Sequence, residues 1–378
     1  MKPLSLAHQT MLPDLIQRCL DAEFNETFSE NGSFAKVKGA NGQQFWYYKG
    51  YNRGEANADS KRFSKYVGQV ADLDVTARVE RFQRVKANYR ELRSLVTSLT
   101  AAGLPSPPAL VGDIVDVLLR AGLFRLHGVL VGTAAFQTYA GLLGVRLPSE
   151  PLMTGDVDFA QFHSISVSVD DSIPPVLEAL RQVDTTFQQI PSLANPRATT
   201  GFSNATGFKV EYLTPNRSKD DFTGEPASMP ALGGASAQPL RYLGFLIHQS
   251  VRSVLLHKGE VAVLVPSPER FAVHKLIVSE LRRADRDSAS KARKDLEQAS
   301  VMIEALANSS SRLDFGLAYI EARDRGPKWR EALEGARKAS FRQKSKSGSI
   351  RLAQMRVPLM GSRGGIEIAA LSSDGYRP

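Results

Sequence analysis

Apolar residues recur at helical spacing over two stretches near the amino terminus. In residues 12–23 they fall three or four positions apart, which predicts a first helix. In residues 72–101 an approximately heptad stripe runs from Val75 to Leu99 and forms the longest helical signal in the chain. Such a stripe suits an arm or the seam of a homodimer, and it also suits one long helix packed on its own domain, which we favour.

Between these helices, aromatic residues alternate with polar ones on both sides of an Asn-Gly turn. Residues 33–37 and 45–48 flank the turn, which predicts an antiparallel hairpin, and residues 62–67 are suited to a third strand. Lysine and arginine lie among the aromatic residues, a pattern that suits stacking on nucleic acid. A small sheet also needs its aromatic residues to close a core, and we favour the core.

A proline-rich break at residues 103–108 is followed by alternating strand and helix patterns. Residues 126–131 are typical of a strand, and apolar residues from Phe136 to Leu143 have the spacing of a helix. Residues 214–239, rich in glycine and proline, are interpreted as an irregular loop. Shorter strands are predicted at residues 165–169, 187–190, 199–202, 208–213, 253–256 and 261–265. The alternation predicts a mixed α/β fold.

Helical patterns dominate again after the Ser267-Pro268 helix start and continue to about residue 340. The predicted organisation has four parts: residues 1–104 with a helix, a small antiparallel sheet and a long helix; residues 109–266 as the α/β domain; residues 267–341 as a helical domain; and residues 342–378 as a disordered basic tail. The fold class is therefore α/β, with helical flanks and a small amino-terminal sheet.

Composition places the chain of 378 residues among globular proteins, because 42% of its residues are hydrophobic and 23% are charged. No apolar run is long enough to span a membrane, so we expect a cytoplasmic protein without a membrane partner. The single cysteine, Cys19, excludes an internal disulfide. The net charge of +9, to which residues 342–378 contribute seven basic residues against Glu367 and Asp374, favours a polyanionic partner.

Two aspartates separated by one apolar residue are the strongest candidate for chemistry. In a strand, Asp156 and Asp158 point to the same face, while Val157 and Phe159 point into a core. Oxygen ligands held that close suit Mg²⁺ or Mn²⁺ bridging phosphates. Glu211 lies on the more polar face of a later strand, where it suits a third metal ligand or a simple exposed glutamate.

A glycine lies at the turn from the first strand of this region into its helix. Gly132 allows close approach of a ligand, and the first helical turn can present backbone N–H groups to a triphosphate. Thr133 suits either a hydroxyl contact to the ligand or a helix cap. A glycine at such a turn is also common without any ligand. His127, which opens this strand, suits either a contact with the nucleotide or a structural role, and we favour the structural role.

The order of glycine turn, carboxylate pair and third carboxylate resembles the DNA polymerase beta-like nucleotidyltransferase superfamily. Within it, the chain is most similar to a bacterial nucleotidyltransferase-fold family related to abortive-infection and toxin nucleotidyltransferases, over residues 120–305. The resemblance implies a nucleotidyltransferase-type mixed sheet and transfer of NMP from an NTP, such as ATP, to a hydroxyl of RNA, protein or a small molecule, with release of pyrophosphate. By the same resemblance, Asp156, Asp158 and Glu211 are expected to hold two Mg²⁺ ions, and Gly132, Thr133 and Lys275 to bind the triphosphate.

Other interpretations stay open at this point. A D-x-D glycosyltransferase would use the same acids on a nucleotide sugar, and an inactive nucleotide-binding or nucleic-acid-binding module would keep the fold without turnover. A D-x-D-x-T phosphatase is disfavoured because Ala160 stands where Thr or Val is needed. The basic face formed by Lys275, Arg282 and Arg286 suits a polyanionic acceptor or simply a solvated helix surface.

Overall fold

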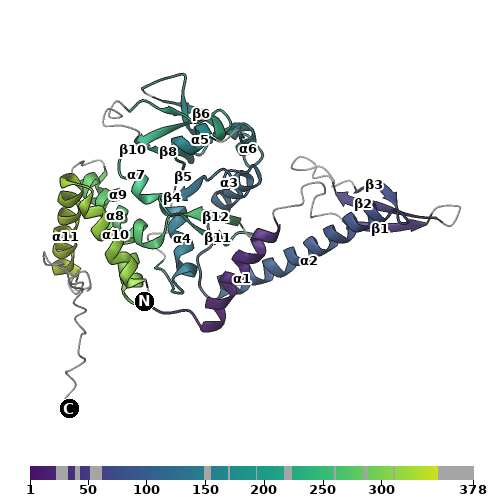
Figure 1. Ribbon diagram of the computed structural model, residues 1–378, viewed down its shortest axis with the longest axis horizontal. Helices are drawn as coiled ribbons and strands as arrows, with labels where there is room; N and C mark the ends of the chain where they lie inside the picture. The colour runs from purple at the N-terminus through teal and green to yellow at the C-terminus, as the bar shows by residue number, and fades with distance from the viewer. Residues whose placement is uncertain are drawn as a thin grey trace, which may run out of the picture.

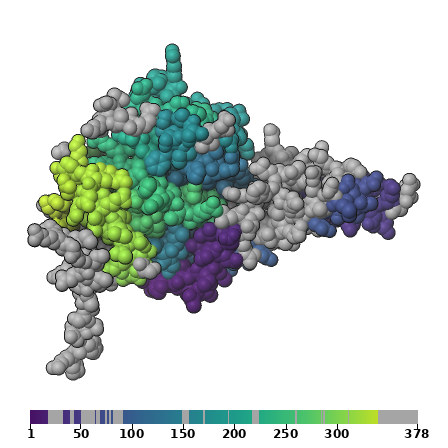
Figure 2. All heavy atoms as spheres, in the orientation of Figure 1, coloured from purple at the N-terminus to yellow at the C-terminus, as the bar shows by residue number. Residues whose placement is uncertain are grey.

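The protein consists of a mixed α/β body from which an arm projects (Figures 1 and 2). The computed structural model describes residues 1–22, 33–38, 43–51, 62–148, 155–168, 171–192, 194–216, 224–258, 261–283, 285, 288–309 and 311–347. Most of the predicted basic tail, residues 348–378, lies outside the described residues. None of the helices in the described ranges is long and apolar enough to cross a membrane.

A mixed sheet forms the centre of the body. Its main path runs β4-β5-β8-β10-β9, and β7, which carries β6, pairs with β8. β5 and β8 are parallel, as are β8 and β10, whereas β4 is antiparallel to β5. The strands are β4 (Val129–Val131), β5 (Asp156–Ala160), β6 (Gln188–Pro191), β7 (Thr199–Ser203), β8 (Lys209–Pro215), β9 (Ala227–Ser228) and β10 (Ser236–Leu240). The predicted mixed α/β fold is confirmed.

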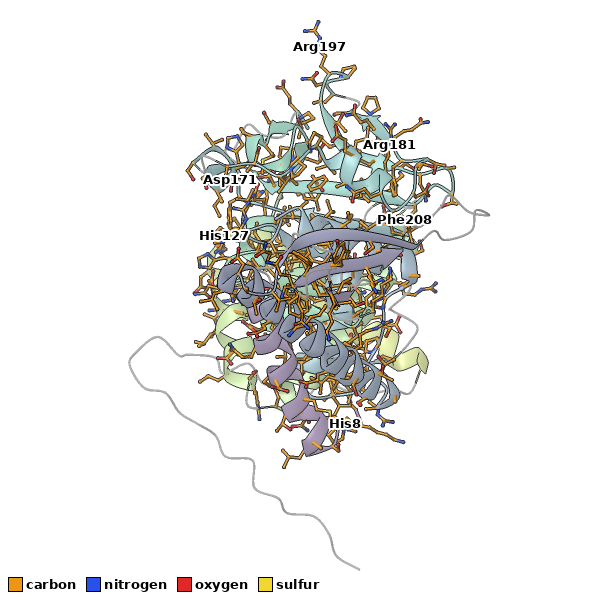
Figure 3. The ribbon with its side chains drawn as sticks, turned by 90° about the vertical axis from the view of Figure 1, so that its right-hand side faces the viewer. His8, His127, Asp171, Arg181, Arg197 and Phe208 are labelled. Carbon is orange, nitrogen blue, oxygen red and sulfur yellow. The ribbon has the colours of Figure 1, made fainter. Side chains whose placement is uncertain are left out.

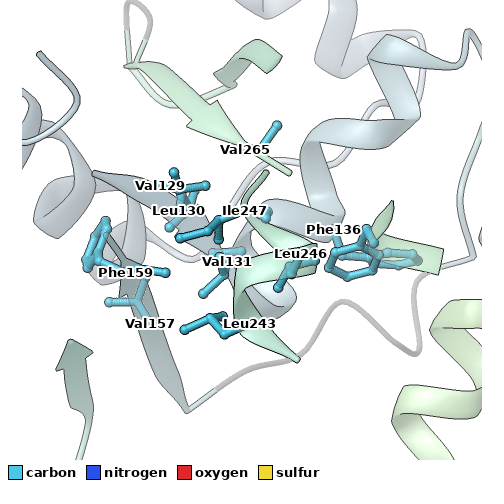
Figure 4. Packing of buried hydrophobic residues seen from close by; sticks show 14 of the residues in the cluster. Val129, Leu130, Val131, Phe136, Val157, Phe159, Leu243, Leu246, Ile247 and Val265 are labelled. Carbon is cyan, nitrogen blue, oxygen red and sulfur yellow. The ribbon is translucent and has the colours of Figure 1, made fainter. Parts of the chain in front are cut away.

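The alternating residues of β5 and β8 build the core beneath this sheet. Val157 and Phe159 point into the interior with the apolar residues of β4 (Figure 4). Phe159 stacks on Tyr212 of β8 with ring centroids 5.9 Å apart. Burying one face of each strand directs the intervening residues, including all three candidate carboxylates, to the other face.

Helices and a second hairpin enclose the sheet. These elements are α3 (Ala109–Arg120), α4 (Gly132–Leu142), α5 (His163–Ser168), α6 (Val176–Arg181), the short helix η3 (Pro230–Leu232), α7 (Leu243–Leu246), β11 (Val251–Leu255), β12 (Val261–Val265), α8 (Pro268–Arg283), α9 (Ala289–Ala307), α10 (Arg312–Asp324) and α11 (Pro327–Ser347). Residues of the last four helices, such as Phe271, Met302 and Leu333, share one core with the sheet. The domain boundary predicted at residue 266 stays a prediction.

Two predicted elements differ from the structure. Residues 165–168 belong to helix α5 instead of forming a strand, because Ile-Ser-Val-Ser alternates too briefly to exclude a helix. The predicted loop at residues 214–239 contains β9 and β10, and β10 joins β8 through Gln238, Pro239 and Leu240. The sequence did not predict β10 because its residues are small or polar and form no hydrophobic pattern. Ala237 is buried only through its position in the folded sheet.

The arm consists of a small sheet carried on a long helix. It contains β1 (Ser33–Lys38), β2 (Gln44–Tyr51) and β3 (Arg62–Gln69), joined antiparallel in that order, and α2 (Leu73–Ala101). Trp46 of β2 is buried and donates a hydrogen bond from Nε1 to Thr76 Oγ1 of α2 at 3.0 Å. The predicted hairpin strands are confirmed, while their Asn-Gly turn lies outside the described residues.

The carboxyl-terminal half of α2 anchors the arm to the body. Leu92, Val96 and Leu99 are buried in a cluster that they share with helix α1 (Leu6–Ala22) and with residues of α4 and β11. The 29 residues of α2 span about 43 Å at 1.5 Å per residue, so its other end reaches beyond the body (Figure 1). This half of the predicted apolar stripe is thus covered by other residues of the same chain. A homodimer through α2 stays a prediction.

Candidate active site

Asp156 and Asp158 lie on one face of β5, as the alternation predicts. Both are half-buried, whereas Val157 and Phe159 are buried on the opposite face. β5 is short and central, between β4 and β8, so its residues are held by hydrogen-bonded neighbours on both sides. The two carboxylates are therefore carried by a central strand, and central strands are among the most stable parts of a fold.

The register of the sheet brings the third acid beside this pair. Asp158 of β5 is the direct neighbour of Glu211 of the parallel strand β8, and Asp156 is the neighbour of Lys209. Neighbouring strands lie about 4.8 Å apart, and aligned residues share a face. Glu211 is half-buried between buried Val210 and Tyr212, so it faces the same side as the aspartates.

The glycine turn lies directly against the carboxylate pair. Val131, the last residue of β4, pairs with Asp158 in antiparallel register, and α4 begins with the next residue, Gly132. Gly132 has a φ of +69°, and a Cβ atom there would lie 2.8 Å from Asp158 Oδ2. Only glycine meets both conditions, because other residues are strained at that φ and would collide with the carboxylate.

Thr133 lies in the first turn of α4 and faces helix α9 instead of open solvent. It is 9% exposed, and Gln298 Nε2 of α9 donates a hydrogen bond to its Oγ1 at 3.4 Å. No side chain caps the start of α4, where Val131 occupies the N-cap position. The first backbone N–H groups of α4 thus have no side-chain cap, in keeping with an anion site at a helix start.

Lys275 occupies a buried ion-pair cluster between α8 and α9. It is 9% exposed, and its Nζ donates a hydrogen bond to Asp295 Oδ1 at 2.6 Å, while Arg282 donates to Oδ2 of the same carboxylate. The Lys275 ammonium also lies 5.3 Å from the centre of the Phe271 ring. One buried carboxylate thus holds two cations in fixed positions, which is the arrangement that makes buried charge tolerable.

The electrostatics connect this cluster to the acids. Desolvation and the neighbouring charges of Asp156 and Glu211 raise the pKa of Asp158 to about 7, although Lys275 and Arg282 act in the opposite direction. The charges of Asp156 and Glu211 therefore disfavour ionisation of Asp158, and the charges of Lys275 and Arg282 favour it. This mutual repulsion is the electrostatic property expected of a cation-binding site.

The pKa of a second lysine, Lys294 of α9, also depends on the charge of the acidic residues. Desolvation and Lys275 lower the pKa of Lys294, and Asp156 and Asp295 raise it. Lys294 precedes Gln298 by four residues and therefore lies on the same helix face, one turn from the contact with Thr133. Burial and Lys275 also lower the pKa of neighbouring His274 to about 3, so this histidine is neutral at physiological pH.

The candidate acids are adjacent without converging on one point. Among the residues that the structure describes, no group of three or more His, Cys, Asp or Glu side chains is arranged to hold a metal ion. Asp156, Asp158 and Glu211 share a face and adjacent strands, but like charges repel unless a cation lies between them.

Some predicted residues lie elsewhere, and others were not foreseen. His127 is exposed in the turn before β4 with a φ of +60° (Figure 3), not at the start of the strand as predicted. Arg286 of the predicted basic face lies outside the described residues. Asp295 and Gln298 had no predicted role. Their only sequence signal is a polar residue on the buried face of an amphipathic helix.

The comparisons with known proteins assign a family. The sequence profile of the family described as Nucleotidyltransferase matches residues 109–324, more than half of the 378 residues, and the chain therefore belongs to the nucleotidyltransferase family. The chain is also similar to a solved structure described as an antigenic nucleotidyltransferase-like protein from Paracoccidioides brasiliensis, with 16% identity, a TM-score of 0.27, and coverage of 60% of this chain and 93% of that chain. No curated protein sequence matches the chain.

Proposed function

We propose that this protein transfers NMP from an NTP to an acceptor hydroxyl and releases pyrophosphate, using Asp156, Asp158 and Glu211 as its acidic site. The observation that carries the proposal is the register of the sheet. It aligns Glu211 beside Asp158 and sets Gly132 against the same carboxylate. Membership of the nucleotidyltransferase family supports this reaction class.

The acidic residues fit divalent cations. The raised pKa of Asp158 means that ionising all three carboxylates is unfavourable without a positive charge between them. The donor atoms are carboxylate oxygens, which suit Mg²⁺ and also Mn²⁺. In the proposal, Asp156 and Asp158 hold two ions, and Glu211 turns to complete the second site. When bound, the ions supply neutralisation of the triphosphate and a lowered pKa of the acceptor hydroxyl.

The remaining residues would bind and orient the triphosphate. Gly132 lets the ligand approach the backbone, and the N–H groups at the start of α4 donate to phosphate oxygens. Lys275 and Arg282 supply positive potential from positions that Asp295 holds fixed. Preorganised charges of this kind stabilise the leaving pyrophosphate without having to reorient during the reaction. Lys294 would add a further positive charge near the triphosphate, since its pKa depends on the charge of Asp156.

The test is pyrophosphate release and transfer of label. The purified protein is incubated with each α-³²P-labelled NTP, Mg²⁺ and a cell extract, and the label is separated into RNA, protein and small-molecule fractions. Asp156→Asn and Asp158→Asn are expected to abolish transfer while circular dichroism shows an unchanged fold. Asp314→Asn, which alters an exposed aspartate of α10, is the matched control and should leave transfer unchanged.

Three results would contradict the proposal. Transfer at the wild-type rate by either acidic-site variant would remove the carboxylate pair from the chemistry. Turnover of a UDP-sugar without pyrophosphate release would instead indicate a glycosyltransferase, and nucleotide binding without any metal-dependent product would indicate an inactive binding module.

A further inference from the structure

The positive charge of this protein is concentrated outside its α/β body. Residues 102–341, which contain the sheet, the acidic site and the helices around them, hold 26 basic and 26 acidic residues and are neutral. Residues 33–101, which contain the arm, hold 13 basic and 6 acidic residues, a net charge of +7 within a total of +9. The charge that would attract a polyanion is therefore carried largely by the arm, together with the basic carboxyl-terminal segment.

The small sheet of the arm has two different faces. On β2, Trp46 and Tyr48 are buried toward α2, and the alternate residues Phe45, Tyr47 and Lys49 lie on the outer face, half-buried or exposed. This outer face combines aromatic rings with an ammonium group. The structure therefore places Trp46 and Tyr48 on the buried side of the sheet and Phe45 and Tyr47 on the other side.

The edge of the same sheet adds further cations. β1 is an edge strand, and its residues Lys36, Val37 and Lys38 are exposed. Lys36 pairs with Trp46 and Lys38 with Gln44, so these two lysines emerge along the β1 edge on the α2 side, whereas Lys49 shares the outer face with Phe45 and Tyr47. Lys36 lies over the Trp46 ring with its Nζ 5.0 Å from the ring centre. Edge lysines prevent pairing of the sheet with another strand, so addition of a β-strand from a second protein is disfavoured here.

We infer that the outer face of β1 and β2, together with the β1 edge, binds single-stranded nucleic acid. Lys49 on the outer face and Lys38 at the edge would contact phosphates. Phe45 and Tyr47 would stack on unpaired bases, which a duplex keeps covered. A flexible acidic peptide would use the lysines but would gain nothing from the aromatic rings. The inference rests on the proposed function in one respect, because it identifies the bound strand as the class of acceptor.

The distance of the sheet from the body explains why binding and chemistry can be separated by experiment. The buried anchor residues of α2 lie in its carboxyl-terminal half, and the sheet is carried by the opposite end (Figure 1). Substitutions on the outer face are therefore expected to change the affinity for the strand without disturbing the acidic site.

The experiment measures binding of the full chain to four fluorescent probes by anisotropy at two or more salt concentrations. The probes are a 20-nucleotide single-stranded RNA of mixed sequence, the DNA strand of the same sequence, the DNA duplex and polyglutamate. The first variant, Lys38→Gln with Lys49→Gln, removes two exposed cations of the arm. Its control, Lys328→Gln with Arg330→Gln, removes two exposed cations of α11 on the other side of the body (Figure 1).

Single strands are expected to bind more tightly than the duplex or polyglutamate. Loss of two phosphate contacts should reduce the slope of log K against log salt concentration by about 1.4 in the arm variant and leave it unchanged in the control. Tyr47→Leu, which retains an apolar side chain, should weaken binding about tenfold through loss of stacking. Comparison of RNA with DNA determines which of the two strands is preferred.

Equal binding by the arm variant and its control would overturn the inference, as would duplex or polyglutamate binding as tight as that of the single strands. Asp158→Asn separates the inference from the proposed function. It should lose nucleotidyl transfer and keep the affinity of the wild type for the strand. If the strand is the acceptor, the arm variant should raise the KM for the strand with kcat unchanged. Arm-dependent binding without transfer by the wild type would support the binding surface and refute the proposed function.

Discussion

Replacing Asp158 by asparagine should abolish activity and at the same time stabilise the fold. Burial and the charges of Asp156 and Glu211 raise the pKa of Asp158 from 3.8 to about 7. At 1.36 kcal/mol per pKa unit, ionising Asp158 at pH 8 costs the folded state about 4 kcal/mol as an upper bound. Because the side chain is partly exposed, water relieves some of this cost, and we expect about 2 kcal/mol.

The pH dependence follows from the sign of the pKa change. The folded protein binds the Asp158 proton more tightly than the unfolded chain, so this contribution to stability is complete below pH 4 and is lost as the pH rises to about 7. Asparagine does not titrate. The variant should therefore match the wild type at pH 4 and exceed its Tm by about 4 °C at pH 8, since 1 kcal/mol corresponds to about 2 °C in a chain of this size.

The assay is thermal unfolding followed by circular dichroism between pH 4 and pH 8 without divalent ions. Asp184→Asn is the control of opposite sign, because hydrogen bonds from Thr186 and Asn204 lower the pKa of Asp184 and the variant should be less stable than the wild type above that pKa. Mg²⁺ at 100 times its Kd should stabilise the wild type by about 2.7 kcal/mol and have little effect on Asp158→Asn. A lower Tm of Asp158→Asn than of the wild type at pH 8 would refute the reasoning.

Three further substitutions test the packing around the site. Gly132→Ala should weaken NTP binding in equilibrium titrations and lower stability by about 1–2 kcal/mol, since alanine is strained at positive φ and its Cβ meets Asp158 Oδ2; unchanged affinity would remove the turn from the site. Asp295→Ala should cost about 3–5 kcal/mol in urea unfolding, because it leaves buried Lys275 unpaired, and Asp295→Asn should cost less. Phe159→Ala should cost about 3–5 kcal/mol through the cavity it opens in the core, and a loss under 1 kcal/mol would contradict the packing described here.

Local patterns were sufficient where apolar residues recur regularly at the period of one element. The alternation around Asp156 predicted a strand with both aspartates on one face, and the helical stripe predicted α2 within one residue of its bounds, Leu73–Ala101. The same reasoning failed for residues 165–168, where four alternating residues were too few to separate a strand from a helix. It also failed for β10, whose small residues carry almost no hydropathy signal.

The candidate site divides in the same way. The sequence alone determined which residue types are present, that Asp156 and Asp158 share a face, and that Gly132 lies between a strand and a helix, because each of these depends on neighbours in the chain. Only the tertiary structure decided that Glu211 aligns with Asp158, that Gly132 lies against that carboxylate, and that Lys275 pairs with a buried aspartate of α9. Strand register and helix packing minimise the exposed apolar surface of the whole molecule, so no short segment contains the information that sets them.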